Sequence, residues 1–156
     1  MISTAAKTDE AGILSVASNI EVFSEEEKAC VRELWNEYIN RGPQASGYYF
    51  LVHRGDDRVT GFACYGPHAL TSGTYDLYWI GVDPLASRKG VGKDLLAQVE
   101  LEVRGLGGRM IVLDTSSLAE YAPARAFYMS QGYTQEAVVK DFYRTGDDLV
   151  IFTKHL

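Results

Sequence analysis

Residues 82–93 read VDPLASRKGVGK and separate a predicted strand from a predicted helix. The strand, Tyr75–Val82, is rich in aromatic and β-branched residues. The helix begins at Val91, and apolar residues continue at helical spacing as far as Leu106. The next apolar run, Met110–Leu113, is typical of a strand that is buried on both faces. This order of strand, helix and strand predicts a βαβ unit in which the two strands are parallel.

A helix and a hairpin are predicted on the N-terminal side of this unit. Ser24 and Glu27 form a capping-box pattern, and apolar residues at helical spacing continue this helix until Gly42. The runs Tyr48–His53 and Val59–Tyr65 are typical of strands, and the Gly-Asp-Asp sequence between them predicts a hairpin turn. The first dozen residues show no such pattern, and we expect them to be loosely held.

A shorter helix and a closing hairpin are predicted on the C-terminal side. Pro123 lies near the first turn of the helix, which ends at Gly132. The hairpin has the arms Thr134–Tyr143 and Leu149–Lys154. We therefore expect residues 1–156 to form a single α/β domain. Its sheet is expected to be mixed and mostly antiparallel, flanked by helices, with the parallel βαβ unit at its centre.

Composition narrows the classes of partner. The 156 residues carry 15 Lys and Arg against 21 Asp and Glu, a formal charge of −6. This acidic balance argues against a nucleic-acid partner and is consistent with an amine-bearing one. No run approaches the ~18 apolar residues of a membrane span, so no membrane partner is expected.

The cysteines and histidines suggest neither a disulfide framework nor a metal site. Cys30 and Cys64 lie in apolar stretches, which favours reduced thiols and a cytoplasmic protein. The three His and two Cys are well separated, so we expect no bound metal. The first ten residues do not resemble a secretory signal.

The segment Ser87–Lys93 combines glycines with positive charge. Gly90 and Gly92 allow backbone N–H groups to approach a ligand without a Cβ in the way, and a helix start adds unpaired donors. The basic side chains are Arg88, Lys89 and Lys93. These features favour a phosphate or pyrophosphate ligand. A plain loop with two turn glycines is the alternative, because short glycine motifs often match by chance.

Two motifs resemble those of the GNAT superfamily of acyl-CoA N-acyltransferases. Gly81–Pro84 and Ser87–Gly92 are similar to that family's Val-Asp-Pro and Arg/Gln-x-x-Gly-x-Gly/Ala sequences. Ala124–Tyr133 resembles the family's helix with a Phe-Tyr pair followed by Gly and an aromatic residue. The motifs occur in the family's order, which makes the pair far more specific than either one alone. Two residues depart from the pattern: Ser87 replaces Arg or Gln, and Tyr121 replaces the Asn of many members.

The resemblance implies an enzyme that transfers an acetyl group from acetyl-CoA to a primary amine by direct attack in a ternary complex. It implies that the coenzyme's pyrophosphate binds the glycine loop and that its pantetheine arm enters between two splayed parallel strands. The residues so implicated are Ile80, Gly81, Val82, Arg88, Lys89, Gly90, Val91, Gly92, Lys93, Thr115 and Tyr121. Many relatives are dimers, so a homodimer is possible.

Amide formation needs a base for the amine proton and a proton for the departing thiolate. The resemblance places Tyr128 near the coenzyme sulfur as the general acid, whereas packing against the sheet is its structural alternative. Asp76 stands where family members often hold a carboxylate that serves as base, directly or through water. Its alternative is a surface carboxylate at a strand end. By strand alternation Tyr78 shares the face of Asp76 and is a candidate for the acceptor pocket.

Two other functions are compatible with these motifs. One is a non-catalytic acyl-CoA sensor that signals to a protein partner, and the other is a nucleotide-binding module that uses the glycine loop. The amine itself is open: a small metabolite, a peptide N-terminus or a lysine.

Overall fold

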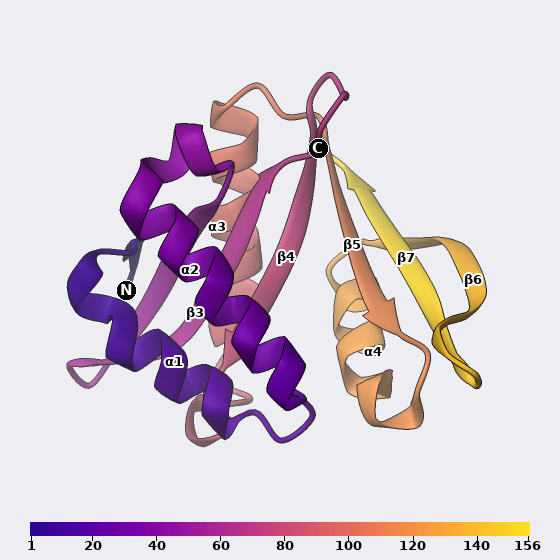
Figure 1. The fold of residues 1–156 in the computed structure, drawn as a ribbon, viewed down its shortest axis with the longest axis horizontal. Helices are drawn as coiled ribbons and strands as arrows, with labels where there is room; N and C mark the ends of the chain where they lie inside the picture. Colours follow the sequence, from indigo (N-terminus) through magenta and orange to yellow (C-terminus); the bar gives the residue numbers. More distant parts are fainter.

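A seven-stranded sheet with helices on both faces runs through the computed structural model, which describes all of residues 1–156 (Figure 1). Its helices and strands, in chain order, are β1 (Ile2–Thr4), α1 (Glu10–Asn19), α2 (Glu25–Ser46), β2 (Tyr49–Gly55), β3 (Arg58–Pro67), β4 (Thr74–Val82), α3 (Val91–Gly105), β5 (Met110–Ser116), α4 (Ala122–Ser130), β6 (Thr134–Arg144) and β7 (Asp147–His155). Three short 3-10 helices are η1 (Lys7–Asp9), η2 (Pro84–Ala86) and η3 (Ala119–Tyr121).

The strand order is β1-β2-β3-β4-β5-β7-β6, and only the β4–β5 pair is parallel. The predicted fold class is therefore confirmed, including the central β4-α3-β5 unit. No helix is both long enough and apolar enough to cross a membrane.

Two hydrophobic clusters lie on opposite faces of the sheet. On one face, Leu95, Leu96 and Val99 of α3 are fully buried against β2, β3 and β5. On the other face, Ile13 of α1 and Trp35 of α2 are fully buried against β2 and β3. Helix α4 packs its Phe127 and Tyr128 on the α3 side. The sheet is thereby held rigid on both faces, and its loops and strand ends are left to form the site.

The predicted start of α2 is confirmed, but its predicted end is wrong. The Ser24 hydroxyl accepts the Glu27 N–H at 3.1 Å, and the Glu27 carboxylate accepts the Ser24 N–H at 2.7 Å. Gly42 leaves the helical conformation, with φ 76° and ψ 167°, yet helical structure resumes at Pro43. Proline suits the first turn of a helix, so the Gly-Pro pair kinks α2 instead of ending it.

The expectation of a loose N-terminus is also wrong. Strand β1 pairs with β2, and the Ala5 N–H continues this pairing with a 2.9 Å bond to the Phe50 carbonyl. The Asp9 carboxylate accepts the Arg54 guanidinium at 2.6 Å. These partners lie more than forty residues away along the chain, so the local sequence carries no sign of them.

Strand β5 is not buried on both faces as predicted. Ile111 and Leu113 are buried, but Met110 and Val112 are only half-buried and Asp114 is exposed. The reason is that Ile111 and Leu113 face the α3 side, whereas the hydrophobic cluster on the other face of the sheet contains no residue of β5. The β2–β3 turn is confirmed, with left-handed angles at Asp56 and Asp57, and both cysteines are free thiols.

Candidate active site

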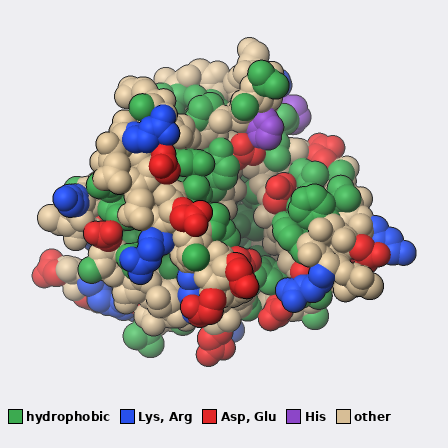
Figure 2. Space-filling model, viewed as in Figure 1, with side chains coloured by type: hydrophobic (Ala, Val, Ile, Leu, Met, Phe, Trp, Pro, Cys, Tyr) green, Lys and Arg blue, Asp and Glu red, His purple; other side chains and the backbone are tan.

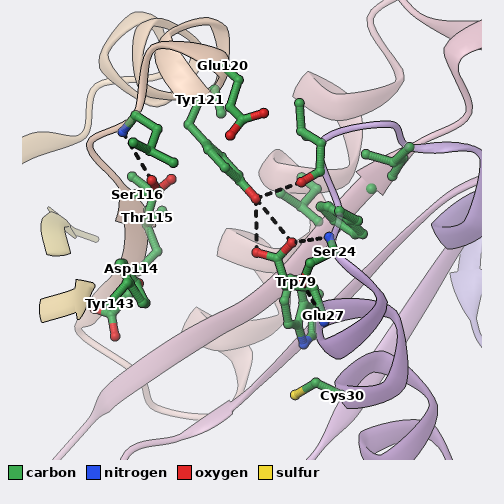
Figure 3. Close-up of a pocket in the computed structure, with 18 of the residues that line it drawn as sticks. Ser24, Glu27, Cys30, Trp79, Asp114, Thr115, Ser116, Glu120, Tyr121 and Tyr143 are labelled. Carbon is green, nitrogen blue, oxygen red and sulfur yellow. Dashed lines mark hydrogen bonds between the residues drawn. The ribbon is translucent and has the colours of Figure 1, made fainter. Parts of the chain in front are cut away.

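Strands β4 and β5 form a parallel pair over only part of their length. They pair from Thr74 with Met110 to Asp76 with Val112, and beyond this point β4 pairs only with β3, and β5 only with β7. A cavity of about 870 Å³ enters the opening (Figure 3). The β4 and β5 residues that line it are Leu77–Val82 and Leu113–Ser116. The sheet thus opens where the resemblance implied the arm of the coenzyme.

Tyr78 interrupts the regular pairing of β4 beside this opening. Cys64 of β3 is paired with Trp79, but the next β3 residue, Tyr65, is paired with Leu77, so Tyr78 is an extra residue. Such a bulge bends a strand and increases its twist. It also places Tyr78 and Trp79 on the same side of the sheet, the side that α1 and α2 cover. The bulge helps to turn β4 away from β5 and brings Tyr78 into the wall of the cavity.

Asp83 fixes the loop that follows β4. Its carboxylate accepts the Leu85 N–H at 2.9 Å and the Arg58 guanidinium at 2.5 Å. The hydrogen bond from Arg58 is the main reason that the pKa of the Asp83 carboxyl lies below its usual range. Pro84 then begins η2. The Val-Asp-Pro sequence therefore ends β4 and sets the direction of the glycine loop.

The glycine loop presents six consecutive backbone N–H groups, from Arg88 to Lys93, that have no acceptor within the protein. Three of them belong to the first turn of α3, where N–H groups lack an intrahelical partner. Arg88 and Gly90 have left-handed backbone angles, with φ of 63° and 80°, which turn the chain into the helix. Free donors at the positive end of a helix dipole are suited to a phosphate group.

A second cavity, of about 1220 Å³, lies against this loop. It shares Ile80, Val82, Tyr121 and Tyr128 with the first, so the two cavities form one groove from the loop to the opening in the sheet. Of the residues predicted to bind the coenzyme, all but one line this groove. The exception is Lys89, which is exposed and belongs to neither lining.

Tyr128 lies at the junction of the two cavities. Its ring packs against Phe127, Tyr133 and Phe152, with centroid distances of 5.5 to 6.1 Å. Its hydroxyl has no hydrogen-bond partner in the protein, although every fully buried side-chain polar atom has one. The hydroxyl is therefore open to the groove. Burial raises the pKa of the phenol above its usual range, so it stays protonated at neutral pH.

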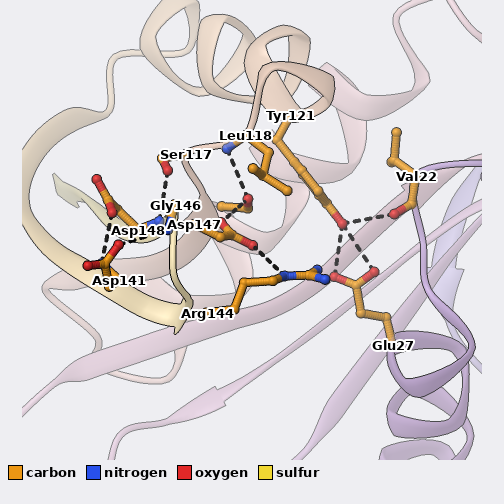
Figure 4. Close-up of polar contacts among 11 residues, drawn as sticks. Val22, Glu27, Ser117, Leu118, Tyr121, Asp141, Arg144, Gly146, Asp147 and Asp148 are labelled. Atoms are coloured by element: carbon orange, nitrogen blue, oxygen red, sulfur yellow. Dashed lines mark hydrogen bonds and ion pairs between the residues drawn. The ribbon is translucent and has the colours of Figure 1, made fainter.

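Tyr121 spans the groove between η3 and the N-terminal end of α2 (Figure 4). Its hydroxyl lies 2.9 Å from the Val22 carbonyl oxygen and 3.0 and 3.1 Å from the two carboxylate oxygens of Glu27. Burial and the Glu27 carboxylate raise the pKa of this phenol. Since the hydroxyl is already bonded within the protein, the aromatic ring is the part of Tyr121 left to face a ligand.

Asp76 lies at the last paired position of β4, beside the loop that joins β3 to β4. Its carboxylate is 2.8 Å from Nδ1 of His68, and it does not line either cavity. Asp114, two residues beyond the β5 partner of Asp76, does line the first cavity. Desolvation and, secondarily, the charge of Asp76 raise the pKa of the Asp114 carboxyl.

Asp114 was missed at the sequence level because the apolar run that marks β5 stops at Leu113. Strand alternation is the sequence signal that could have placed Asp114 beside the site. Val112 and Asp114 must share one face of the sheet, opposite to the buried Ile111 and Leu113. A polar residue at that position has no apolar neighbour to pack against once β4 has turned away.

The basic side chains of the glycine loop lie at one end of the groove. Arg88 and Lys93 line the second cavity, together with Glu21, Asp83 and Glu120. At the other end the charged side chains of the first cavity are Glu21, Glu26, Glu27, Asp114, Glu120, Arg144 and Asp147. Acidic side chains surround the hollow between the two parts of the sheet in Figure 2. No group of three or more His, Cys, Asp or Glu side chains is placed to hold a metal ion.

Comparisons with known proteins identify the family. Residues 45–135 match the acetyltransferase (GNAT) domain family. The chain is similar to the crystal structure of a Desulfovibrio desulfuricans protein assigned to the GNAT family of acetyltransferases. The two share 40% sequence identity and a TM-score of 0.95 over 99% of this chain and 98% of that one. No curated protein sequence matches the chain.

Two more distant structures share the fold. A ribosomal-protein-alanine N-acetyltransferase from Brucella melitensis is 23% identical, with a TM-score of 0.79 over 100% of this chain and 99% of that one. An aminoglycoside 6'-N-acetyltransferase in complex with coenzyme A is 16% identical, with a TM-score of 0.77 over 99% and 96%. Fold and groove define an acyltransferase of the GNAT type. This chain belongs to the GNAT family and is an acetyltransferase.

Proposed function

We propose that this acetyltransferase moves the acetyl group of acetyl-CoA to a primary amine by direct attack in a ternary complex. The amine nitrogen forms a bond to the thioester carbonyl carbon, the carbon–sulfur bond breaks, the amine loses a proton and the thiolate gains one. The observation that carries the proposal is the continuous groove. It joins six free N–H donors at one end to an acidic cavity at the other, with the Tyr128 hydroxyl between them.

The loop end of the groove fits a coenzyme diphosphate. The N–H groups of Arg88–Lys93 supply donors, and the side chains of Arg88 and Lys93 supply charge. The edge of β4 at Ile80, Gly81 and Val82 has no strand partner on the β5 side, so it is free to bond amides of the pantetheine arm. Thr115 and the Tyr121 ring line the opposite wall. Lys89 contributes charge only at long range.

Tyr128 is the proposed general acid. Its phenol is neutral, open to the groove and without a competing partner, so it is able to donate a proton to the departing thiolate. A proton transfer of this kind contributes typically ~10²–10⁴-fold to rate.

Two carboxylates on one face of the sheet are candidates for the base. Asp114 lines the cavity and takes the amine proton directly in our proposal. Asp76, the residue predicted from sequence, lies behind it and acts through Asp114 or through water. An alkyl amine is protonated at neutral pH, so the attack requires such an acceptor.

The acidic end of the groove suits an amine that arrives as a cation. A small-molecule amine and a peptide amine both fit this description, and the two distant neighbours illustrate both by name. The formal charge of −6 argues against nucleic acid as a partner. We also propose a cytoplasmic location. A homodimer stays a prediction.

Calorimetry and a thiol-release assay test the proposal together. We expect acetyl-CoA and CoA to bind and ATP to bind far more weakly, and we expect free thiol to appear with at least one member of a panel of amines. Tight ATP binding without CoA binding would favour the nucleotide module. CoA binding without thiol release from any amine, at a pH where the amines are partly neutral, would favour the acyl-CoA sensor.

A further inference from the structure

His68 is held in a defined position beside the active-site opening. Its N–H donates to the Thr74 carbonyl at 2.8 Å, and its carbonyl accepts the Thr71 hydroxyl at 2.7 Å. These bonds fix the loop between β3 and β4 on both sides of the residue. The imidazole thereby sits with Nδ1 2.8 Å from the Asp76 carboxylate, and its other side faces solvent, with 54% of the side chain exposed.

Asp76 connects this imidazole with the cavity. It is paired with Val112, and Asp114 follows two residues later on the same side of β5. Asp76, with 20% of its side chain exposed, is more enclosed than His68. The His68–Asp76 pair thus lies where the two strands part, on the face of the sheet where Asp114 lines the cavity.

We propose that His68 is a positioning residue for acetyl transfer, which sets, through Asp76, the pH at which Asp114 accepts the proton of the amine. The inference rests on the proposed function. A protonated His68 neutralises Asp76, which lowers the cost of a second negative charge at Asp114. Without the imidazole, the negative charge of Asp76 acts on Asp114 without this compensation, so Asp114 holds its proton to higher pH.

The other charged groups of this cavity are Glu21 of the loop between α1 and α2, Glu26 and Glu27 of α2, Glu120 of η3, Arg144 of β6 and Asp147 of β7. Two tyrosines, Tyr78 and Tyr143, also line it. Burial and the neighbouring Asp76 raise the pKa of Tyr78, so it is neutral. Glu27 is engaged with Ser24 and Tyr121, and Arg144 lies 3.8 Å from Asp147. Tyr143 is neutral, since burial and the charge of Asp114 raise its pKa to about 12. Burial and the charge of Asp76 raise the pKa of the Asp114 carboxyl, and His68 lowers it.

The test is the pH dependence of kcat/KM. We expect His68→Gln to move the acid limb to higher pH by about 0.5–1 unit, because the charge it removes is partly solvated. Asp76→Asn is expected to move the limb in the opposite direction, to lower pH. His68→Lys retains the positive charge and should leave the limb at or below its wild-type position. If His68 only stabilised the loop, the His68→Gln and Asp76→Asn variants would not move the acid limb in opposite directions.

A variant that combines His68→Gln with Asp76→Asn shows whether His68 acts on Asp114 through Asp76. In the Asp76→Asn background, His68→Gln should produce less than half of its shift in the wild type. His155→Gln is the matched control, because His155 is exposed at the end of β7 and has no side-chain partner. An unmoved limb in His68→Gln, or an equal shift in both backgrounds, would overturn the proposal.

A second measurement does not depend on turnover. The Asp114 carboxyl of the free protein can be titrated by NMR, and His68→Gln should raise its midpoint while coenzyme affinity stays within about twofold. An unchanged midpoint overturns the inference about His68 even when acetyl transfer is intact. Failure of the wild type to acetylate any amine would instead overturn the proposed function, and the NMR titration would still report the coupling.

Discussion

At the scale of single residues, Tyr128 has the three properties that a proton donor to a thiolate needs. Its hydroxyl is unpaired, opens into the groove and stays protonated at neutral pH. Tyr128→Phe removes the hydroxyl and leaves the ring packing in place. We expect kcat to fall by about 10²-fold or more, with coenzyme affinity within twofold of wild type. Steady-state kinetics and calorimetry check both numbers.

Tyr65→Phe is the matched control for this substitution. Tyr65 is buried on β3, its hydroxyl has no side-chain partner, and it lines neither cavity. Its loss of a hydroxyl should leave kcat unchanged. Equal kcat in wild type and Tyr128→Phe would remove Tyr128 from the mechanism.

The ionisation of the Asp114 carboxyl also affects the free energy of unfolding. Its pKa is raised in the folded protein, so between the ordinary carboxyl pKa of ~3.9 and the folded value the native state binds more protons than the unfolded state. The free energy of unfolding therefore falls as pH rises through that window, and the full penalty applies at neutral pH. Asp114→Asn should raise stability at neutral pH and flatten this decline.

Urea unfolding at several pH values measures the effect. Asp57→Asn is the control, because Asp57 is exposed in the β2–β3 turn, where its left-handed angle suits Asn equally well. A decline of the same steepness in wild type and Asp114→Asn would show that Asp114 is not responsible for it.

Single residues also mark the limit of sequence-based reasoning about the site. The glycine loop and Tyr128 were predicted because each lies in a motif that is continuous in sequence. Asp114 and His68 were not, because their significance depends on the parting of β4 and β5 and on one loop contact. No local pattern encodes either feature.

At the scale of elements, the N-terminal end of α3 is the part whose function rests on the backbone. Gly90 has φ 80° and lines the second cavity, and a Cβ there would meet no protein atom within 4 Å. We expect Gly90→Ala to cost about 1–2 kcal/mol from the left-handed angle. It should also weaken coenzyme binding about tenfold or more, since the methyl group occupies the approach to the N–H donors.

Gly107 separates these two effects. It has nearly the same angle, φ 84°, and equal open space, but it lies after α3 and lines neither cavity. Gly107→Ala should lose a similar amount of stability and retain coenzyme affinity. If the two variants bind CoA equally well by calorimetry, the loop is an ordinary turn and not a phosphate site.

The elements differ in how far the sequence predicted them. The β4-α3-β5 unit and both hairpins have strong local signals, namely helical spacing, β-branched runs and turn residues. Strand β1 and helix α1 depend on partners in β2 and on burial of Ile13, Val16 and Ala17. Their stability is tertiary, so their sequence resembles a loose terminus. The Gly42-Pro43 pair predicts the end of a helix, but the same two residues are equally compatible with the kink that the structure shows.

At the scale of the whole molecule, the parting of β4 and β5 leaves two parts of the sheet joined by few backbone bonds. Only three residue pairs connect them along the strands. On the α3 side, Lys154 of β7 bonds Glu100 of α3. Across the groove, the Tyr121 hydroxyl adds a further connection, from η3 to Val22 and Glu27. A protein that must admit a long coenzyme between its halves needs such a link outside the opening itself.

Tyr121→Phe tests whether that link holds the halves in place. Because the lost partner is a carboxylate, we expect a decrease in the free energy of unfolding of about 1–2 kcal/mol, or ~2–8 °C in Tm, without coenzyme. Coenzyme affinity should stay within about threefold, since the ring still lines both cavities.

Tyr143→Phe is the control. Tyr143 lies in the wall of the first cavity and its hydroxyl has no side-chain partner, so this variant should leave Tm unchanged. Thermal unfolding measures Tm, and calorimetry measures the affinity for CoA. If Tyr121→Phe leaves Tm unchanged but lowers CoA affinity tenfold, the hydroxyl serves the coenzyme and not the fold.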